Sequence, residues 1–130
     1  MFHSPGFAGM ASKRYAAVHA GGRIGGASPH GLVKILFDEL TLAMDAGALA
    51  LDQGEVLKAN DKHVRALSIV QALEVSLDFD KGGEIAVSLA QIYRETRRLL
   101  LSSYSSRDSG DVRMARGLIG EIAEAWEQIG

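Results

Sequence analysis

Histidine is the residue type in this chain best suited to binding a metal ion or carrying a phosphoryl group. The chain has four histidines: His3, His19, His30 and His63. A di-iron site inside a helical bundle needs a glutamate three residues before each of two histidines. Asn60 and Ala27 stand at those positions before His63 and His30, so neither pair fits. The chain also has no cysteine for a zinc site, and we expect neither a metal nor a cofactor.

His63 is also the candidate residue for phosphoryl transfer. Histidine phosphotransfer domains carry an exposed histidine in the middle of a helix, usually followed by a lysine and a glycine. His63 lies in a segment with helical periodicity and precedes Arg65, but the Lys-Gly pair is missing. Its neighbours Asp61 and Lys62 instead indicate a polar surface position. A phosphotransfer domain is kept as an alternative, in which phosphate would be incorporated by this chain and not by a His63→Gln variant.

No other pattern typical of an enzyme is present. The glycine run from Gly21 to Gly26 has no preceding strand and no Gly-Lys-Ser/Thr ending, so it indicates a linker or hinge rather than a phosphate-binding loop. Ser28 has no base beside it, and no pair of carboxylates stands apart from the solvated helix faces. We therefore expect a protein that is not an enzyme.

The charged residues are nearly balanced, with a net charge of −2 and a pI of about 6.1. A dedicated nucleic-acid-binding protein usually has a clear basic excess, so we expect no nucleic acid partner. Six arginines nevertheless gather in one part of the sequence: Arg94, Arg97, Arg98, Arg107, Arg113 and Arg116. We interpret them as a solvated end of the protein, offset by Glu95, Asp108 and Asp111. An acidic docking partner is the alternative.

The elements that would position these residues are helices. Both prolines lie in the first 29 residues, and no later segment alternates with the period of two that strands require. We expect residues 1–27 to form a flexible, glycine-rich N-terminal arm with a short cap helix at 10–20, and residues 28–130 to form the body. No apolar run approaches the ~20 residues of a membrane span, and no signal-peptide pattern appears. We therefore expect a cytoplasmic protein without membrane insertion.

Four helices are predicted in the body. Ser28 is a typical N-cap followed by a proline, so the first helix should run from Pro29 to Asp52 and end at Gln53-Gly54. A second helix is expected over 55–79, a turn over 80–83 and a third helix over 84–104. The fourth, capped by Ser109 or Asp111, should end at residue 129. Because short connections make consecutive helices antiparallel neighbours, the expected fold is all-α, an antiparallel up-down four-helix bundle.

Apolar residues spaced by three and four predict the inward face of each helix. On the second helix this face is assigned to the following residues: Val56, Val64, Leu67, Val70, Leu73 and Leu77. On the fourth helix the assigned residues are Val112, Ala115, Leu118, Ile119, Ile122, Trp126 and Ile129. These rows would meet in the centre of the bundle.

The first helix has more apolar residues than one inward stripe needs. One flank of its inward face carries Val33, Phe37, Met44 and Leu51, and the other carries Ile35, Leu42, Ala46 and Leu49. The run from Leu99 to Leu101 shows a similar excess, since three consecutive leucines cannot all point into one seam. Either the first helix is the central one, or one of its flanks lies in an open groove that a partner helix covers.

The order and spacing of several short motifs resemble the FliS family of flagellar secretion chaperones. The motifs are Tyr15, Ser28-Pro29, the run 32–38, the run 66–73, Ser76-Leu77-Asp78, the run 82–86, Leu89, Ile92-Tyr93 and Glu124-Ala125-Trp126. They extend from residue 15 to the end of the fourth predicted helix. The sequence departs from the family pattern at Gly31, where an acidic residue is common, and at 94–98, which is usually aromatic and rich in methionine.

The resemblance implies a cytoplasmic export chaperone. Such a protein binds the disordered C-terminal segment of flagellin in an apolar groove, prevents its premature polymerisation and keeps it competent for flagellar type III secretion. A flagellar export-gate component is then a candidate second partner, and the free chain is a candidate homodimer. By position, Tyr15 on the arm would cover part of the groove in the free protein, with residues 21–26 as the hinge.

We assign the flagellin-binding groove to apolar residues of the arm, the first helix and the third helix: Tyr15, Val33, Leu36, Phe37, Leu40, Leu89, Ile92, Tyr93 and Leu100. Each has a competing interpretation as an ordinary core residue. A Phe37→Asp variant separates the two, because a charge in the core would unfold the domain whereas a charge in the groove would only abolish binding. A generic helical homodimerisation module is a further alternative.

Overall fold

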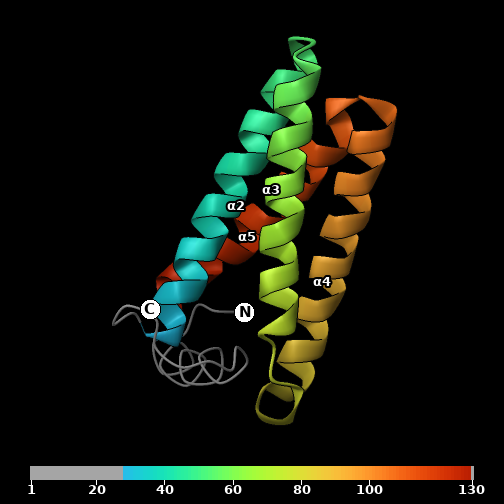
Figure 1. Ribbon diagram of the computed structural model, residues 1–130. Coiled ribbons are helices and arrows are strands. Elements are labelled where there is room, and N and C mark those ends of the chain that lie inside the picture. Colours follow the sequence, from blue (N-terminus) through green and yellow to red (C-terminus); the bar gives the residue numbers. More distant parts are fainter. Residues whose placement is uncertain (1–27, 130) are drawn as a thin grey trace.

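The computed structural model of the chain describes residues 28–129, which form four α-helices (Figure 1). Helix α2 spans Pro29–Asp52, α3 spans Val56–Val75, α4 spans Phe79–Ser106 and α5 spans Ser109–Ile129. Successive helices run in opposite directions, and α2 and α4 each pack against both α3 and α5. The predicted all-α up-down four-helix bundle is thereby confirmed. The predicted arm, its cap helix and Tyr15 lie outside the described residues.

The first helix of the bundle begins and ends where the sequence predicts. The hydroxyl of Ser28 accepts a hydrogen bond of 3.1 Å from the backbone N–H of Gly31, and Pro29 occupies the first turn. Gln53 is the C-cap, and its N–H donates to the carbonyl of Leu49. No acidic side chain lies in the first turn of α2, so the helix start depends on Ser28 and proline alone.

The boundary between α3 and α4 differs from the prediction. Helix α3 ends at Val75, and Asp78 starts α4 by accepting a 3.1 Å hydrogen bond from the N–H of Lys81. The residues predicted to form a turn, 80–83, therefore lie within the start of α4, after Phe79. They still interrupt regular helix, because Gly83 has φ +52° and ψ −127°. A positive φ is a conformation that glycine adopts without steric cost, so the glycine kinks the helix instead of separating two helices.

A buried serine fixes the turn between α4 and α5. The Ser103 hydroxyl donates to the carbonyl of Asp108 at 2.6 Å and accepts from the N–H of Val112 at 2.9 Å. Helix α4 ends at Ser106, two residues later than predicted. The first-turn N–H of Gly110 donates to the Asp108 carboxylate at 2.9 Å, so Asp108 rather than Ser109 or Asp111 satisfies it.

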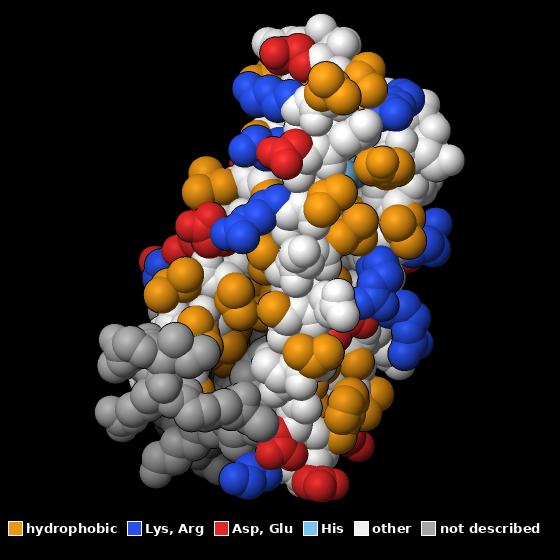
Figure 2. Space-filling view, in the orientation of Figure 1, with side chains coloured by type: hydrophobic (Ala, Val, Ile, Leu, Met, Phe, Trp, Pro, Cys, Tyr) orange, Lys and Arg blue, Asp and Glu red, His pale blue; other side chains and the backbone are white. Residues whose placement is uncertain are grey.

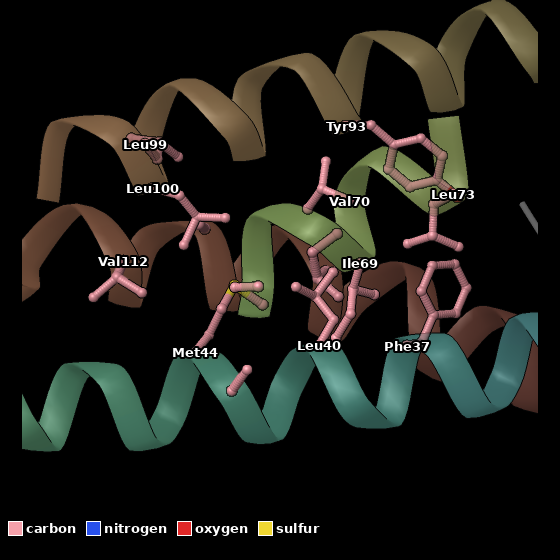
Figure 3. Close-up of a cluster of buried hydrophobic side chains, with 14 of the residues drawn as sticks. Phe37, Leu40, Met44, Ile69, Val70, Leu73, Tyr93, Leu99, Leu100 and Val112 are labelled. Carbon is pink, nitrogen blue, oxygen red and sulfur yellow. The ribbon is translucent and has the colours of Figure 1, made fainter. Parts of the chain in front are cut away.

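The hydrophobic core contains side chains from all four helices (Figure 3). Phe37, Leu40 and Met44 point inward from α2 toward Val70 and Leu73 of α3. Leu99 and Leu100 are both buried, whereas Leu101 is 49% exposed, as three consecutive leucines require. From α5 the core receives Val112, Ala115, Ile119 and Trp126, as predicted, with Leu118 and Ile122 partly buried against it.

The inward face of α3 is partly wrong in the prediction. Val56 and Val64 are exposed, at 46% and 56%, and Ala59, His63 and Ala66 are buried in their place. The small alanines let α3 approach α2 closely. At the contact, a Cβ added to Gly47 of α2 would lie 3.1 Å from Nδ1 of His63. Because the turn of α3 that faces α2 has so little room, it holds small residues and one planar ring rather than valines.

Candidate functional site

Most residues assigned to the groove from the sequence lie in the interior of the bundle. Six of them are at most 4% exposed and belong to the hydrophobic core: Val33, Phe37, Leu40, Leu89, Tyr93 and Leu100. Figure 3 shows Phe37, Leu40, Tyr93 and Leu100 within one cluster. Leu36 and Ile92 are half-buried. In this conformation the six buried side chains support a surface from beneath, and other residues would make the contacts with a partner.

A second set of large apolar side chains is exposed on α2, α3 and α4. We call it the apolar face, and its members are Ile35, Leu42, Leu49, Leu57, Val64, Val75, Val87, Leu101 and Tyr104. Their exposures range from 39% for Tyr104 to 85% for Leu57. Figure 2 shows hydrophobic side chains over the three helices, with charged side chains between them. Single exposed apolar residues are normal on a protein surface, but many of them on one side of a molecule favour an interaction site.

On α2 the exposed residues repeat every seven positions. Ile35, Leu42 and Leu49 therefore lie in one line, two helical turns apart. The line is opposite the buried row that includes Val33, Leu40 and Gly47. These three residues belong to one of the two apolar flanks predicted for this helix. The prediction of extra apolar residues there therefore agrees with their exposure in the folded protein.

On α3 the exposed residues point outward, and on α4 Tyr104 and Leu101 lie on the side near α3. Leu57, Val64 and Val75 point away from the buried row of α3. Tyr104 of α4 faces α3, since its ring lies 6.2 Å from the ring of His63 with an edge-to-face orientation. Leu101 lies one turn from Tyr104 on the same side of α4. On α3 the spacing of residues 57, 64 and 75 indicates one helix face. The prediction misses this face because it assigns Val64 to the inward row instead.

Surface ion pairs bridge neighbouring helices of the bundle. Arg65 of α3 pairs with Glu39 of α2 at 3.7 Å, and Arg97 of α4 pairs with Glu74 of α3. Five of the six clustered arginines have a partner within the described residues, the fifth being the Arg107 hydrogen bond to the Asn60 amide oxygen. The arginines do not form one end, because the α3 partners of Arg97 and Arg107, Glu74 and Asn60, lie at opposite ends of that helix. Arginines already paired within the protein offer little to an acidic partner.

The structure places His63 in the interior, not on the surface as its neighbours Asp61 and Lys62 indicated. The residue is 2% exposed, and its Nδ1 lies 2.9 Å from the carbonyl oxygen of Ala59. Its Nε2 is buried and has no hydrogen-bond partner among the described residues. A phosphodonor protein cannot reach either ring nitrogen in this conformation. The phosphotransfer alternative therefore loses its candidate residue.

The buried imidazole predicts a pH dependence of stability. Burial lowers the pKa of His63 from its ordinary value of 6.5, so the folded chain keeps the ring neutral where the unfolded chain protonates it. The unfolded state then binds more protons just below pH 6.5, and the free energy of unfolding should fall as the pH is lowered through that window. The slope can reach about 1.4 kcal/mol per pH unit for one histidine.

Urea unfolding of the native chain and of His63→Gln between about pH 5.5 and 7.5 measures this contribution. The variant should give a flatter profile. Burial also lowers the pKa of His30. A matched His30→Gln variant therefore measures how much of the pH dependence of the free energy of unfolding comes from His30 rather than His63. If His63→Gln keeps the native profile, the ring is not held neutral by the fold.

An open groove of about 570 Å³ lies between α2 and α5. We call it the α2–α5 groove. Its apolar lining comprises Phe37, Leu42 and Ala123, and Gly120 contributes backbone only. Its charged lining comprises Lys34, Asp38, Asp45, Arg116, Glu124 and Glu127. Behind Phe37, Trp126 lies in the core, with its ring centroid 6.1 Å from that of Phe37 and its Nε1 donating to the carbonyl of His30 at 2.9 Å.

None of the helices in the described part of the chain has the length and hydropathy needed to cross a membrane. Nor do residues 28–129 contain a group of three or more histidine, aspartate or glutamate side chains that could hold a metal ion together.

Comparison with known proteins gives one consistent result. Residues 11–130 match the family model described as Flagellar protein FliS. The chain is 37% identical over 118 residues to the flagellar secretion chaperone FliS of Salmonella typhimurium, which covers 90% of this chain and 87% of the relative. It is 28% identical over 115 residues to FliS of Vibrio cholerae, covering 88% and 85%. It is 24% identical over 123 residues to FliSB of Pseudomonas aeruginosa, covering 95% and 98%.

Proposed function

The chain belongs to the FliS family of flagellar secretion chaperones, and from this premise we propose that it binds the disordered C-terminal segment of flagellin and keeps it competent for type III secretion. The family indicated by the sequence motifs is confirmed, and it is a family of chaperones rather than of enzymes. The proposal concerns what this particular chain binds, where it binds it, and in which compartment.

One observation carries the proposal. The apolar face presents nine large hydrophobic side chains, each at least 39% exposed, on three consecutive helices. Leu57 is 85% exposed and Val75 is 75% exposed. A bound client would remove this apolar surface from water, and that burial stabilises the complex. The face extends over several helices, so it suits a long segment that wraps the bundle better than a single short peptide.

This surface would take the place of the apolar contacts that the client makes later in its own assembly. An amphipathic segment that becomes helix only in an assembly has an apolar stripe with no cover while it is free, and it would associate with copies of itself. The apolar face offers it a temporary partner on which the segment folds. Ordering the segment consumes part of the interaction free energy. The net affinity is therefore moderate, and the complex can be taken apart when the client is exported.

The remaining parts of the proposal concern location and further contacts. We place the chain in the cytoplasm, where its client is synthesised. We further propose that segment 1–27, which contains Tyr15, competes with the client for the binding surface. Truncation at residue 26 should then raise client affinity, and an unchanged affinity would count against a competing arm.

A titration tests the proposed client directly. The ligand is a C-terminal peptide of about 40 residues from the flagellin of the same organism, long enough to form several helical turns on the surface. Calorimetry should give saturable one-to-one binding, and circular dichroism of the mixture should exceed the summed helicity of the components. A scrambled peptide of the same composition is the control and should give neither signal.

The outcomes distinguish the candidate functions. Flat heats with a folded, monomeric protein would mean that this chain does not use the flagellin C-terminal segment as its client. A mass that rises with concentration in the absence of peptide, together with flat heats, would favour the homodimerisation module. Binding without a gain in helicity would contradict the proposed folding of the client on the apolar face.

A further inference from the structure

The α2–α5 groove is separate from most of the apolar face. Helix α2 divides them: Glu39 on one side of the helix pairs with α3, whereas Asp38 and Asp45 on the other side line the groove with α5. Leu42 lies at the shared edge. A client that covers α2, α3 and α4 from the apolar face therefore leaves the α5 wall of the groove open.

The groove owes its shape to the small residues of α5. Gly120 and Ala123 face α2, and the absent side chain at position 120 leaves room for Arg116. A Cβ at Gly120 would lie 2.6 Å from Nη1 of Arg116. Arg116 folds across this space and pairs with Asp45 through its Nε at 3.2 Å. The floor is thus apolar and open, with one fixed cation at the Asp45 end.

The charges around the groove do not balance. Four carboxylates and two cations line it, which leaves a net charge of −2. Lys34 donates to Asp38 at 3.1 Å and Arg116 pairs with Asp45, so the α2 acids are satisfied within the protein. The α5 acids are not: Glu124 is exposed and has no hydrogen bond or ion pair with another described residue, and Glu127 has only the long-range attraction of Lys34. The uncompensated charge lies along α5, beside the apolar floor.

We propose that the α2–α5 groove is a second docking surface, for a cationic amphipathic segment of another protein. Apolar side chains of that segment seat against Leu42 and Ala123, above the buried Phe37, and its lysine or arginine side chains reach Glu124 and Glu127. The charge complementarity selects this occupant over a second copy of the chain, because two such acidic rims would repel one another. The segment binds while the client occupies the apolar face.

The test uses a model peptide and the full chain. The probe is a peptide of about 18 residues, five helical turns, built from leucine on one face and lysine on the other. Trp126 is the single tryptophan of the chain and lies edge-on to Phe37, one of the lining residues, so a change in its emission is a supporting signal of binding. Amide shifts in an isotope-labelled sample should change at 34–45 and 116–127. A peptide with glutamate in place of every lysine is the control and should not bind.

Charge reversal identifies the contacts. The double variant Glu124→Lys/Glu127→Lys should weaken the lysine peptide about tenfold or more at low salt, and Glu121→Lys should not. Glu121 is the matched control because it lies on the same helix, carries the same charge and does not line the groove. Each change is at an exposed position, so the thermal unfolding temperature should stay near that of the native chain.

Three outcomes would overturn the proposal. The lysine peptide could fail to bind, its shifts could fall on the apolar face instead of the groove, or its affinity could survive the double charge reversal. The flagellin titration is run on the same double variant and should be unchanged. If it is lost as well, the groove is part of the client surface and not a second site. Failure of the flagellin titration on the native chain leaves this result unaffected.

Discussion

Replacing Phe37 by aspartate is expected to leave no folded protein at room temperature. The side chain is 1% exposed in the core and packs edge-on against Trp126. The variant removes that packing, worth about 3–5 kcal/mol for a buried aromatic residue, and adds a carboxylate without a partner, which costs several more. Domains of this kind are stable by about 5–15 kcal/mol in total. Circular dichroism should show no cooperative thermal transition, and Trp126 emission should be that of an exposed indole.

A matched variant on the same helix shows whether unfolding results from burying the new charge or from introducing a charge anywhere on α2. Leu42 is 63% exposed, so Leu42→Asp should fold and unfold within a few degrees of the native chain. If Phe37→Asp instead folds normally, Phe37 belongs to a surface groove, as its assignment from the sequence had it. Phe37→Leu should fold with a reduced stability, since it keeps the apolar contact and loses the aromatic one.

The largest expected effect on binding comes from α3. In the double variant Leu57→Asp/Val64→Asp, two exposed apolar side chains of the apolar face are replaced by charges that a client would have to bury unpaired. Anchor residues of an interface contribute about 1–3 kcal/mol or more each. The affinity for the flagellin segment should therefore fall about a hundredfold or more. Calorimetry with the same C-terminal peptide measures it.

The control for this variant is Met114→Asp. Met114 is 59% exposed, apolar and on α5, which contributes no residue to the apolar face. It should bind the peptide as the native chain does. Both variants should keep the native thermal transition, because neither alters the core. Equal affinity of the double variant and the native chain would show that the client contacts a different surface.

Local features of the bundle could be predicted because they depend on a few neighbouring residues. Ser28 followed by proline starts a helix through one hydroxyl and one fixed φ angle, and the structure has the helix start there. The extra apolar residues of α2 could also be recognised, because residue spacing alone shows which side chains lie on each flank of a helix. The start of α4 could not be predicted, because both Asp78 and the Gly82-Gly83 pair are suitable places for the chain to leave one helix and begin the next. The capping hydrogen bond to Lys81 prevails.

Four helices, their antiparallel order and the family could be predicted, because periodicity, caps and short motifs are local properties of the chain. Which apolar rows are buried depends instead on how the helices pack against one another. Leu40 and Leu42 lie on opposite sides of α2, and packing against the neighbouring helices buries the first and leaves the second in water. On α3 the close approach of Gly47 admits alanines and His63 and turns Val64 outward. A single helix defines its faces, but the space left by its neighbours selects the one that faces the core.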